Sequence, residues 1–210
     1  MKKDKNNKAI WNRYANFYDA EVLRFSRSAY TEMYRRMPAV LTKEMDVLEI
    51  ATGTGLIAIN VADAVHSIEA TDFSPKMIET AKKKNVPENV HFSIEDATAL
   101  SFSEQTFDAV IISNALHIMP DPELVLANIK RVLKPNGLLI APNFSHGHLQ
   151  DSSWNLSAFI LRLIGFEVYS KWKPEEYVAF INRHGFCVKN WCLMKAAFPL
   201  VYLEATSIDI

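Results

Sequence analysis

Two glycines separated by one residue, Gly53 and Gly55, follow an apolar run rich in β-forming residues and precede a helical pattern. Such a turn lets a ligand approach the backbone closely and presents free N–H groups at the positive end of a helix. Asp72 closes the next predicted strand, where a carboxylate can accept two hydrogen bonds from a ribose diol. This spacing indicates a site for a ligand that carries a ribose. In the alternative interpretation, Asp72 only caps the helix that follows it.

Polar residues also end the next two predicted strands. Asp96 follows the third strand, and Ser113 and Asn114 end the fourth. Because the carboxyl ends of parallel strands form the rim at which open α/β sheets bind ligands, we expect these side chains to share one edge. The alternative is that they are merely the polar residues with which strands commonly end.

Two histidines and an aromatic stripe belong to the same analysis. His117 lies just beyond the fourth predicted strand and His146 just beyond the fifth. An imidazole titrates near neutral pH, so either residue is a candidate base or substrate ligand, although histidines in loops are commonly just solvated. Trp11, Tyr14 and Tyr18 lie at helical spacings, which indicates either core packing or a cover over the rim.

The elements that must position these residues alternate between short β-rich runs and longer helical patterns from residue 45 to residue 145. That alternation predicts a parallel sheet with helices on its faces. The predicted strands are Asp46–Ala51, Ser67–Thr71, Val90–Ile94, Phe107–Ser113 and Leu138–Asn143. Helices are predicted after Gly55, after the N-cap Ser74 with Pro75, and from the N-cap Asp121 with Pro122 to the stop Pro135-Asn136-Gly137.

Further elements flank this core. Residues 8–37 carry apolar side chains at spacings of three, four and seven, which predicts one or two amphipathic helices. Residues 150–170 form an apolar insert that is predicted to be helical, and Pro174–His184 is a predicted helix closed by Gly185. Phe186–Lys195 and Phe198–Thr206 predict an antiparallel pair of strands at one edge. We divide the single domain 1–210 into a helical cap (1–44), a ligand-binding core (45–145), a lid insert (146–173) and a C-terminal helix with the strand pair (174–210).

Composition narrows the functional class. The 210 residues are 49% apolar and 22% charged with a net charge of −1, which excludes a disordered chain and argues against nucleic acid as a partner. Two cysteines, Cys187 and Cys192, are too few for a disulfide framework, so a reducing cytoplasmic compartment is expected. No secretory signal is predicted, and the apolar stretch 154–166 is too short to cross a bilayer. The run Lys82-Lys83-Lys84 is interpreted as solvated charge.

Five motifs in residues 45–145 resemble those of the class I S-adenosylmethionine-dependent methyltransferases. Residues 49–55 (EIATGTG) are similar to the family's E/D-x-G-x-G-x-G signature, and Asp72 stands at its acidic position; residues 94–97, 107–110 and 131–137 are similar to its later motifs. The nearest resemblance is to the ubiquinone/menaquinone-biosynthesis C-methyltransferases and their small-molecule relatives. It implies a three-layer α/β/α Rossmann-like sandwich, a seven-stranded sheet in the order 3-2-1-4-5-7-6, and an antiparallel seventh strand. Ala51 replaces a glycine of the signature, and we expect its φ to be negative.

The resemblance also implies a role for particular residues toward S-adenosylmethionine. Glu49 and the turn through Ala51, Thr52, Gly53 and Gly55 would hold the amino-acid end, and the Tyr18 hydroxyl would reach the carboxylate. Asp72 would hold the ribose, Phe73 and Met77 would flank the adenine, and Asp96 beside Ala97 would accept from the adenine amino group. Ser113 would offer its backbone carbonyl. Carboxylates for the diol and amine, with apolar faces for the ring, agree with what an adenosyl group needs.

The predicted activity is therefore in-line methyl transfer to a small, apolar or aromatic acceptor, without a metal. A base is needed only for a hydroxyl or an acidic carbon, and His117 or His146 would supply it. Two alternatives remain. Gly53-x-Gly55-x-x-Ala58 also satisfies a dinucleotide fingerprint, and Tyr169 with Lys173 forms a Tyr-x-x-x-Lys pair, although Pro174 disfavours the helix that this pair requires. A non-catalytic module that binds the cofactor is the other alternative.

Overall fold

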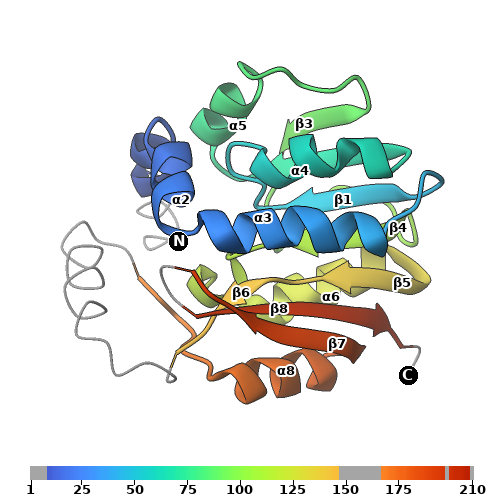
Figure 1. The fold of residues 1–210 in the computed structure, drawn as a ribbon. Coiled ribbons are helices and arrows are strands. Elements are labelled where there is room, and N and C mark those ends of the chain that lie inside the picture. The colour runs from blue at the N-terminus through green and yellow to red at the C-terminus, as the bar shows by residue number, and fades with distance from the viewer. Residues whose placement is uncertain (1–8, 147–166, 197–198, 209–210) are drawn as a thin grey trace.

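A computed structural model describes residues 9–146, 167–196 and 199–208. Its strands are β1 (Asp46–Ile50), β2 (Ser67–Asp72), β3 (Val90–Ile94), β4 (Phe107–Ile112), β5 (Leu133–Ile140), β6 (Asn143–Phe144), β7 (Phe186–Met194) and β8 (Leu200–Ser207). In the described part of the chain they form one sheet in the order β3-β2-β1-β4-β5-β8-β6, and β7 pairs with β8 (Figure 1).

Strand directions agree with the predicted topology. β1 to β5 pair in parallel, whereas β8 pairs antiparallel with both β5 and β7. β8 therefore corresponds to strand 7 of the expected 3-2-1-4-5-7-6 order, and β7 corresponds to strand 6. The short β6, which pairs with β8 beyond the end of β5, is an addition to that order.

Helices cover both faces of the sheet. Apolar side chains of α3 (Arg27–Arg36), α4 (Leu56–Val61) and α5 (Pro75–Ala81) pack on one face, against strand residues that include Val47, Ile68 and Ile111. Those of α6 (Pro122–Val132) and α8 (Pro174–Arg183) pack on the other, against Leu48 and Ile112. Single 3₁₀ turns are η1 (Met37–Ala39), η2 (Ala62–Ala64) and η3 (Leu116–Ile118). The three-layer sandwich is thus confirmed.

The predicted helix boundaries hold where capping chemistry fixed them. Ser74 Oγ accepts from the Met77 N–H at 3.2 Å, and Asp121 Oδ1 accepts from the Leu124 N–H at 3.2 Å. Gly185 follows α8 with a φ of +87°. The predicted stop at 135–137 was wrong, because α6 ends at Val132 and β5 begins at Leu133, which pairs with Phe107 before the register shifts. Residues 135–137 lie in the part of β5 between Leu133 and Leu138, where the pairing with β4 shifts register.

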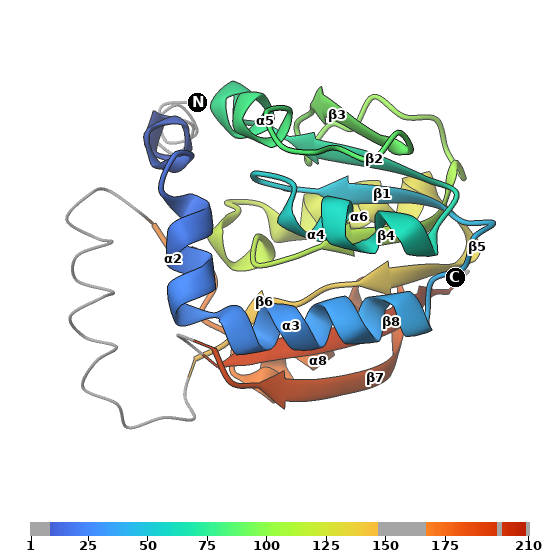
Figure 2. The same cartoon turned by 45° about the horizontal axis from the view of Figure 1, so that its top comes forward.

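The helices predicted for the N-terminal cap are confirmed, whereas the helix predicted for the insert is not found in the part of it that the structure describes. Residues 9–14 are helical, and α2 (Tyr18–Phe25) and α3 follow, as the periodicity of 8–37 predicted. Most of the 150–170 insert lies outside the described residues, and residues 167–173 are not helical. Figures 1 and 2 place α2 at the end of the sheet toward which β1 points.

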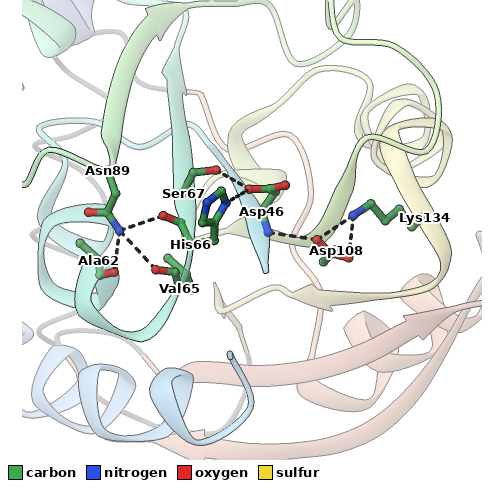
Figure 3. A network of polar contacts seen from close by, with 8 residues as sticks. All are labelled: Asp46, Ala62, Val65, His66, Ser67, Asn89, Asp108 and Lys134. Carbon is green, nitrogen blue, oxygen red and sulfur yellow. Dashed lines mark hydrogen bonds and ion pairs between the residues drawn. The ribbon is translucent and has the colours of Figure 1, made fainter. Parts of the chain in front are cut away.

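A polar network joins four strands at the opposite end of the sheet (Figure 3). Asp46 Oδ1 accepts from Ser67 Oγ at 2.6 Å and lies 2.8 Å from His66 Nδ1. The Asp46 N–H donates to Asp108, whose two carboxylate oxygens each lie 2.8 Å from Lys134 Nζ. The Ser67 and His66 contacts lower the pKa of Asp46. The amino-terminal ends of β1, β2, β4 and β5 are therefore tied together. Within the described ranges, no helix has the length and apolarity to span a bilayer.

Candidate functional site

The turn after β1 has an unusual backbone. Ala51, Gly53 and Gly55 have φ values of +54°, +58° and +77°. The expectation of a negative φ for Ala51 was wrong: the turn requires the left-handed region at this residue although it carries a Cβ. Gly55 is required for space as well, since a Cβ there would lie 2.5 Å from Phe92 Cζ. The Thr52 N–H donates to the Thr71 carbonyl at 2.9 Å, which joins the turn to the end of β2.

The Glu49 side chain binds this turn from the face of β1 that α4 covers. Its Oε2 accepts from Thr52 Oγ1 at 2.7 Å and from the Ala58 N–H of α4 at 2.9 Å. Burial raises the pKa of Glu49 to about 8; the two hydrogen bonds oppose the shift, and nearby Asp72 adds to it. A cation at this position would be stabilised by a carboxylate that burial otherwise keeps protonated.

Asp72 connects the turns after β1 and β2. Its Oδ2 accepts from the Gly53 N–H at 2.9 Å and its Oδ1 from the Ser74 N–H at 2.8 Å. Burial raises the pKa of Asp72 to about 6, against the effect of these two bonds. The N-cap of α5 is Ser74, whose N–H Asp72 binds, so the interpretation of Asp72 as the cap itself is not confirmed. Each carboxylate oxygen keeps a lone pair for a further donor. The sequence could not show the bond to Gly53.

The N-terminal helices lie against both turns. The Tyr18 ring lies 3.6 Å from where a Cβ of Gly53 would be, and its hydroxyl lies 3.4 Å from the Tyr30 hydroxyl. Asn12 Oδ1 accepts from Ser74 Oγ at 2.7 Å and from the Lys76 N–H at 3.3 Å. The rings of Trp11, Tyr14 and Tyr18 meet edge to face with centroids 6.0 to 6.2 Å apart. The aromatic stripe is thus both internally packed and next to the glycine turn.

Lys84 corrects the interpretation of the lysine run as solvated charge. Its ammonium group lies 2.6 Å from Asp19 Oδ2 of α2 and donates to the Thr54 carbonyl at 2.8 Å, and its side chain is 23% exposed. Thr54 Oγ1 in turn donates to Asp19 Oδ1. Three residues far apart in the chain thus attach α2 to the middle of the glycine turn. Lys83, by contrast, pairs with exposed Glu79 at 2.7 Å and is 67% exposed.

The residues assigned to the adenosine end lie in different environments and are not joined to one another as those of the glycine turn are. Phe73 is half-buried, whereas Met77 is fully buried within the packed face of α5. Asp96 is exposed, and its Oδ1 accepts from the N–H and Oγ1 of Thr98. Ala97 packs against the face that α6 covers. The Glu95 N–H donates to the Asp72 carbonyl at 3.3 Å, so the end of β3 does lie beside Asp72.

The end of β4 carries buried polar atoms without hydrogen-bond partners in the described part of the chain. Ser113 Oγ and Asn114 Oδ1 are buried, and no hydrogen bond to either is found within the described residues. Asn114 has a φ of +54°, and its N–H donates to the Pro142 carbonyl at 2.7 Å. Because buried polar atoms are normally satisfied, a ligand with hydrogen-bonding groups fits this end of the rim. The sequence places Asn114 at the end of a strand but does not assign it to the cofactor site, because no sequence pattern indicates that its side-chain oxygen is buried.

The two candidate bases differ in environment. His117 is buried in η3, with Nδ1 2.9 Å from Asn143 Oδ1, and burial lowers its pKa to about 4. His146 is half-buried; burial and then Lys171 lower its pKa. The His146 N–H donates to the Trp172 carbonyl, and the His117 carbonyl accepts from the N–H groups of Tyr169 and Ser170. Both imidazoles are therefore neutral at pH 7.

Comparisons with known proteins agree with this geometry. Residues 48–141 match the model of a family described as methyltransferase domain. A demethylmenaquinone methyltransferase from Renibacterium salmoninarum is 41% identical over 100 residues, which are 48% of this chain and 41% of that protein. A ubiquinone/menaquinone biosynthesis C-methyltransferase from Rickettsia massiliae is 31% identical over 160 residues, 70% of this chain and 63% of that protein. The chain thus spans between two fifths and two thirds of the length of these curated relatives.

A solved structure gives the fold independently. An S-adenosylmethionine-dependent methyltransferase from Thermotoga maritima superposes with a TM-score of 0.74 at 20% identity, covering 95% of this chain and 99% of that chain. The motifs in residues 48–141 and the fold around them therefore agree on one class of domain.

Proposed function

Since residues 48–141 match a methyltransferase domain, we propose that this protein transfers the methyl group of S-adenosylmethionine to a small-molecule acceptor. The observation that carries the proposal is the connection of the first two strand ends by Asp72, which bonds Gly53 and Ser74 while Glu49 stays buried beneath the turn. A dehydrogenase strand would not need a buried acid at the position of Glu49. The Tyr169–Lys173 pair of the oxidoreductase alternative lies in non-helical chain, since Lys173 is extended before α8.

We assign the cofactor contacts residue by residue. Glu49 and the turn through Ala51, Thr52, Gly53 and Gly55 would bind the amino-acid end, with Tyr18 covering it. Asp72 would accept from the ribose hydroxyls, Phe73 and Met77 would border the adenine, and Asp96 with Ala97 would receive its amino group. Ser113, with the unpartnered oxygen of Asn114 beside it, would complete the site at the end of β4. The cofactor supplies a methyl group already activated on a positively charged sulfur.

The work left to the protein is alignment and exclusion of water. The cap, 1–44, and the insert, 146–173, are proposed to enclose the acceptor over the core, 45–145, and the C-terminal part, 174–210. Names of the relatives refer to quinones, which supports an apolar or aromatic acceptor. A cytoplasmic location is proposed separately, from the presence of two cysteines. His117 or His146 would hold the proton of a hydroxyl or carbon acid.

Calorimetry with S-adenosylhomocysteine and with NADH tests the cofactor. Binding of S-adenosylhomocysteine without a response to NADH is expected. NADH binding with no response to S-adenosylhomocysteine would favour the oxidoreductase. A crystal structure with S-adenosylhomocysteine then tests the acceptor: a pocket beside the sulfur lined by charged side chains would contradict an apolar acceptor.

A further inference from the structure

One buried histidine at the rim has its ring bound by an amide. His117 lies in η3 after β4, and Asn143 belongs to β6 after β5. Their side chains meet with Nδ1 2.9 Å from Oδ1, and both residues are buried. The backbones that carry them are also connected, because the Asn114 N–H donates to the Pro142 carbonyl at 2.7 Å. The pair therefore joins the ends of two adjacent parallel strands.

The direction of the Asn143 amide decides which ring nitrogen carries the proton. Asn143 Nδ2 donates to the Phe144 carbonyl at 3.1 Å, which turns Oδ1 toward the imidazole. A carbonyl oxygen can only accept, so Nδ1 of His117 must be the donor. In a neutral imidazole the other nitrogen then has a free lone pair. We infer that Asn143 is a positioning residue that holds His117 as the Nδ1–H tautomer and leaves Nε2 as a hydrogen-bond acceptor.

The surroundings keep this imidazole neutral and fixed. Asn143 is uncharged and so gives an imidazolium no ion-pair partner, and the charge of His146 further lowers the pKa of His117. The Phe144 ring lies edge-on to the imidazole, with centroids 5.8 Å apart. The His117 carbonyl accepts from the N–H groups of Tyr169 and Ser170, which holds the backbone. Rotation of the ring is therefore controlled by its bond to Asn143.

The tautomer specifies the acceptor's chemistry, a step that rests on the proposed methyl transfer. A bare Nε2 binds a group that donates a hydrogen bond, such as a hydroxyl or an N–H on the acceptor. A tertiary amine or a thioether has no such proton at its reacting atom. With His117 in the proposed role at the acceptor, the favoured class of acceptor is one that can donate a hydrogen bond to Nε2.

Long-range ¹H–¹⁵N spectra of the full chain labelled with ¹⁵N-histidine report the tautomer without any ligand. At pH 7 the wild type is expected to show His117 protonated at Nδ1 and bare at Nε2. Asn143→Leu removes the acceptor and should raise the Nε2–H population severalfold. Ser145→Ala is the control, because Ser145 is buried two residues away and its hydroxyl donates to the Pro199 carbonyl instead; its His117 signals should match the wild type.

A second variant covers the case in which Asn143→Leu does not fold. Asn143→Asp keeps an acceptor oxygen, so the Nδ1–H tautomer should persist while the added negative charge raises the pKa of His117. An Nε2–H tautomer in the wild type, an unchanged tautomer in Asn143→Leu, or an unchanged His117 pKa in Asn143→Asp would each overturn the inference. Since these spectra need no cofactor, failure here is separate from a failure to bind S-adenosylhomocysteine, which calorimetry on the same sample measures.

Discussion

Lys84 and Asp19 form an ion pair of 2.6 Å between the chain after α5 and the N-terminal helix α2. Lys84 also donates to the carbonyl of Thr54, which lies between the two glycines of the turn. The cap is therefore attached to the same turn that we propose holds the cofactor, and loss of this contact should affect both.

Replacement of Lys84 by Met is predicted to loosen the cap. An ion pair of this partial exposure contributes about 1 kcal/mol, so the opening of residues 9–25 should become several times more frequent. Hydrogen exchange of that segment measures the change. Lys83→Met is the matched control, since Lys83 pairs with exposed Glu79 on the surface. Equal exchange in the two variants would show that the Lys84 contact does not hold the cap.

Ligand binding is predicted to protect the cap further, because the product must leave in each turnover and a covering segment must open. S-adenosylhomocysteine should slow exchange in residues 9–25. Deletion of residues 1–18 should leave a folded sheet, whose strands all begin at or after Asp46, and should weaken retention of the ligand. Unchanged protection with the ligand would make the N-terminal helices static packing.

Asp72→Ala should weaken binding of S-adenosylhomocysteine by about 1.5–3 kcal/mol, the scale of hydrogen bonds to a charged group. The variant also removes the bond from the Ser74 N–H at the start of α5, so Ser74→Ala serves as a control for disturbance of that helix end. Ser74→Ala loses the N-cap of α5 and the bond to Asn12 but keeps the Asp72 carboxylate and its two backbone donors. If calorimetry finds equal losses in both variants, the loss in Asp72→Ala comes from the disturbed start of α5 and not from a missing contact with the ligand.

The carboxyl group of Glu49 should release a proton when a ligand with an ammonium group binds. Its pKa is raised to about 8 by burial, so it is mostly protonated at pH 7, and a nearby cation favours the carboxylate. Binding enthalpies of S-adenosylhomocysteine at pH 7 should therefore vary with the ionisation enthalpy of the buffer. Glu49→Gln should abolish that component of the variation. A buffer-independent enthalpy in the wild type would contradict the assignment.

The same shift predicts the pH dependence of stability in the free protein. A folded-state pKa above the ordinary value gives a contribution that is present below about pH 4.5 and is lost as the pH rises through about 8. Asp72 acts in the same direction between its ordinary pKa of 3.8 and about 6. Denaturant unfolding should show Glu49→Gln gaining stability relative to wild type as the pH rises over that range.

Ala51→Gly should raise the free energy of unfolding by up to about 1 kcal/mol. A left-handed backbone costs a residue with a Cβ about 1–2 kcal/mol, and part of the gain is offset by the greater unfolded-state entropy of glycine. Ala58→Gly, in the buried interior of α4, should destabilise instead. Urea denaturation compares them; destabilisation by Ala51→Gly would show that the methyl group's packing outweighs the backbone cost.

Local chemistry explains which features the sequence could predict. Ser74 and Asp121 cap their helices through bonds to residues three positions away, and buried strands such as Phe107–Ile112 are apolar at nearly every position. The pairing of Lys84 with Asp19 depends on how distant segments pack, and no pattern within the lysine run distinguishes Lys84 from its neighbours. The left-handed φ of Ala51 likewise results from closing the turn onto β2, which overrides the residue's own preference.

The interior position of β8 determines the order in which the sheet can be completed. β8 follows every other strand of the described chain, yet it lies between β5 and β7. On a ribosome, β1 to β5 emerge earlier and can pair with one another, while the outer edge of β5 has no partner until residues 200–207 arrive. An unpaired edge is a template for other chains. The nascent protein is therefore prone to aggregation in the interval before β8 is inserted.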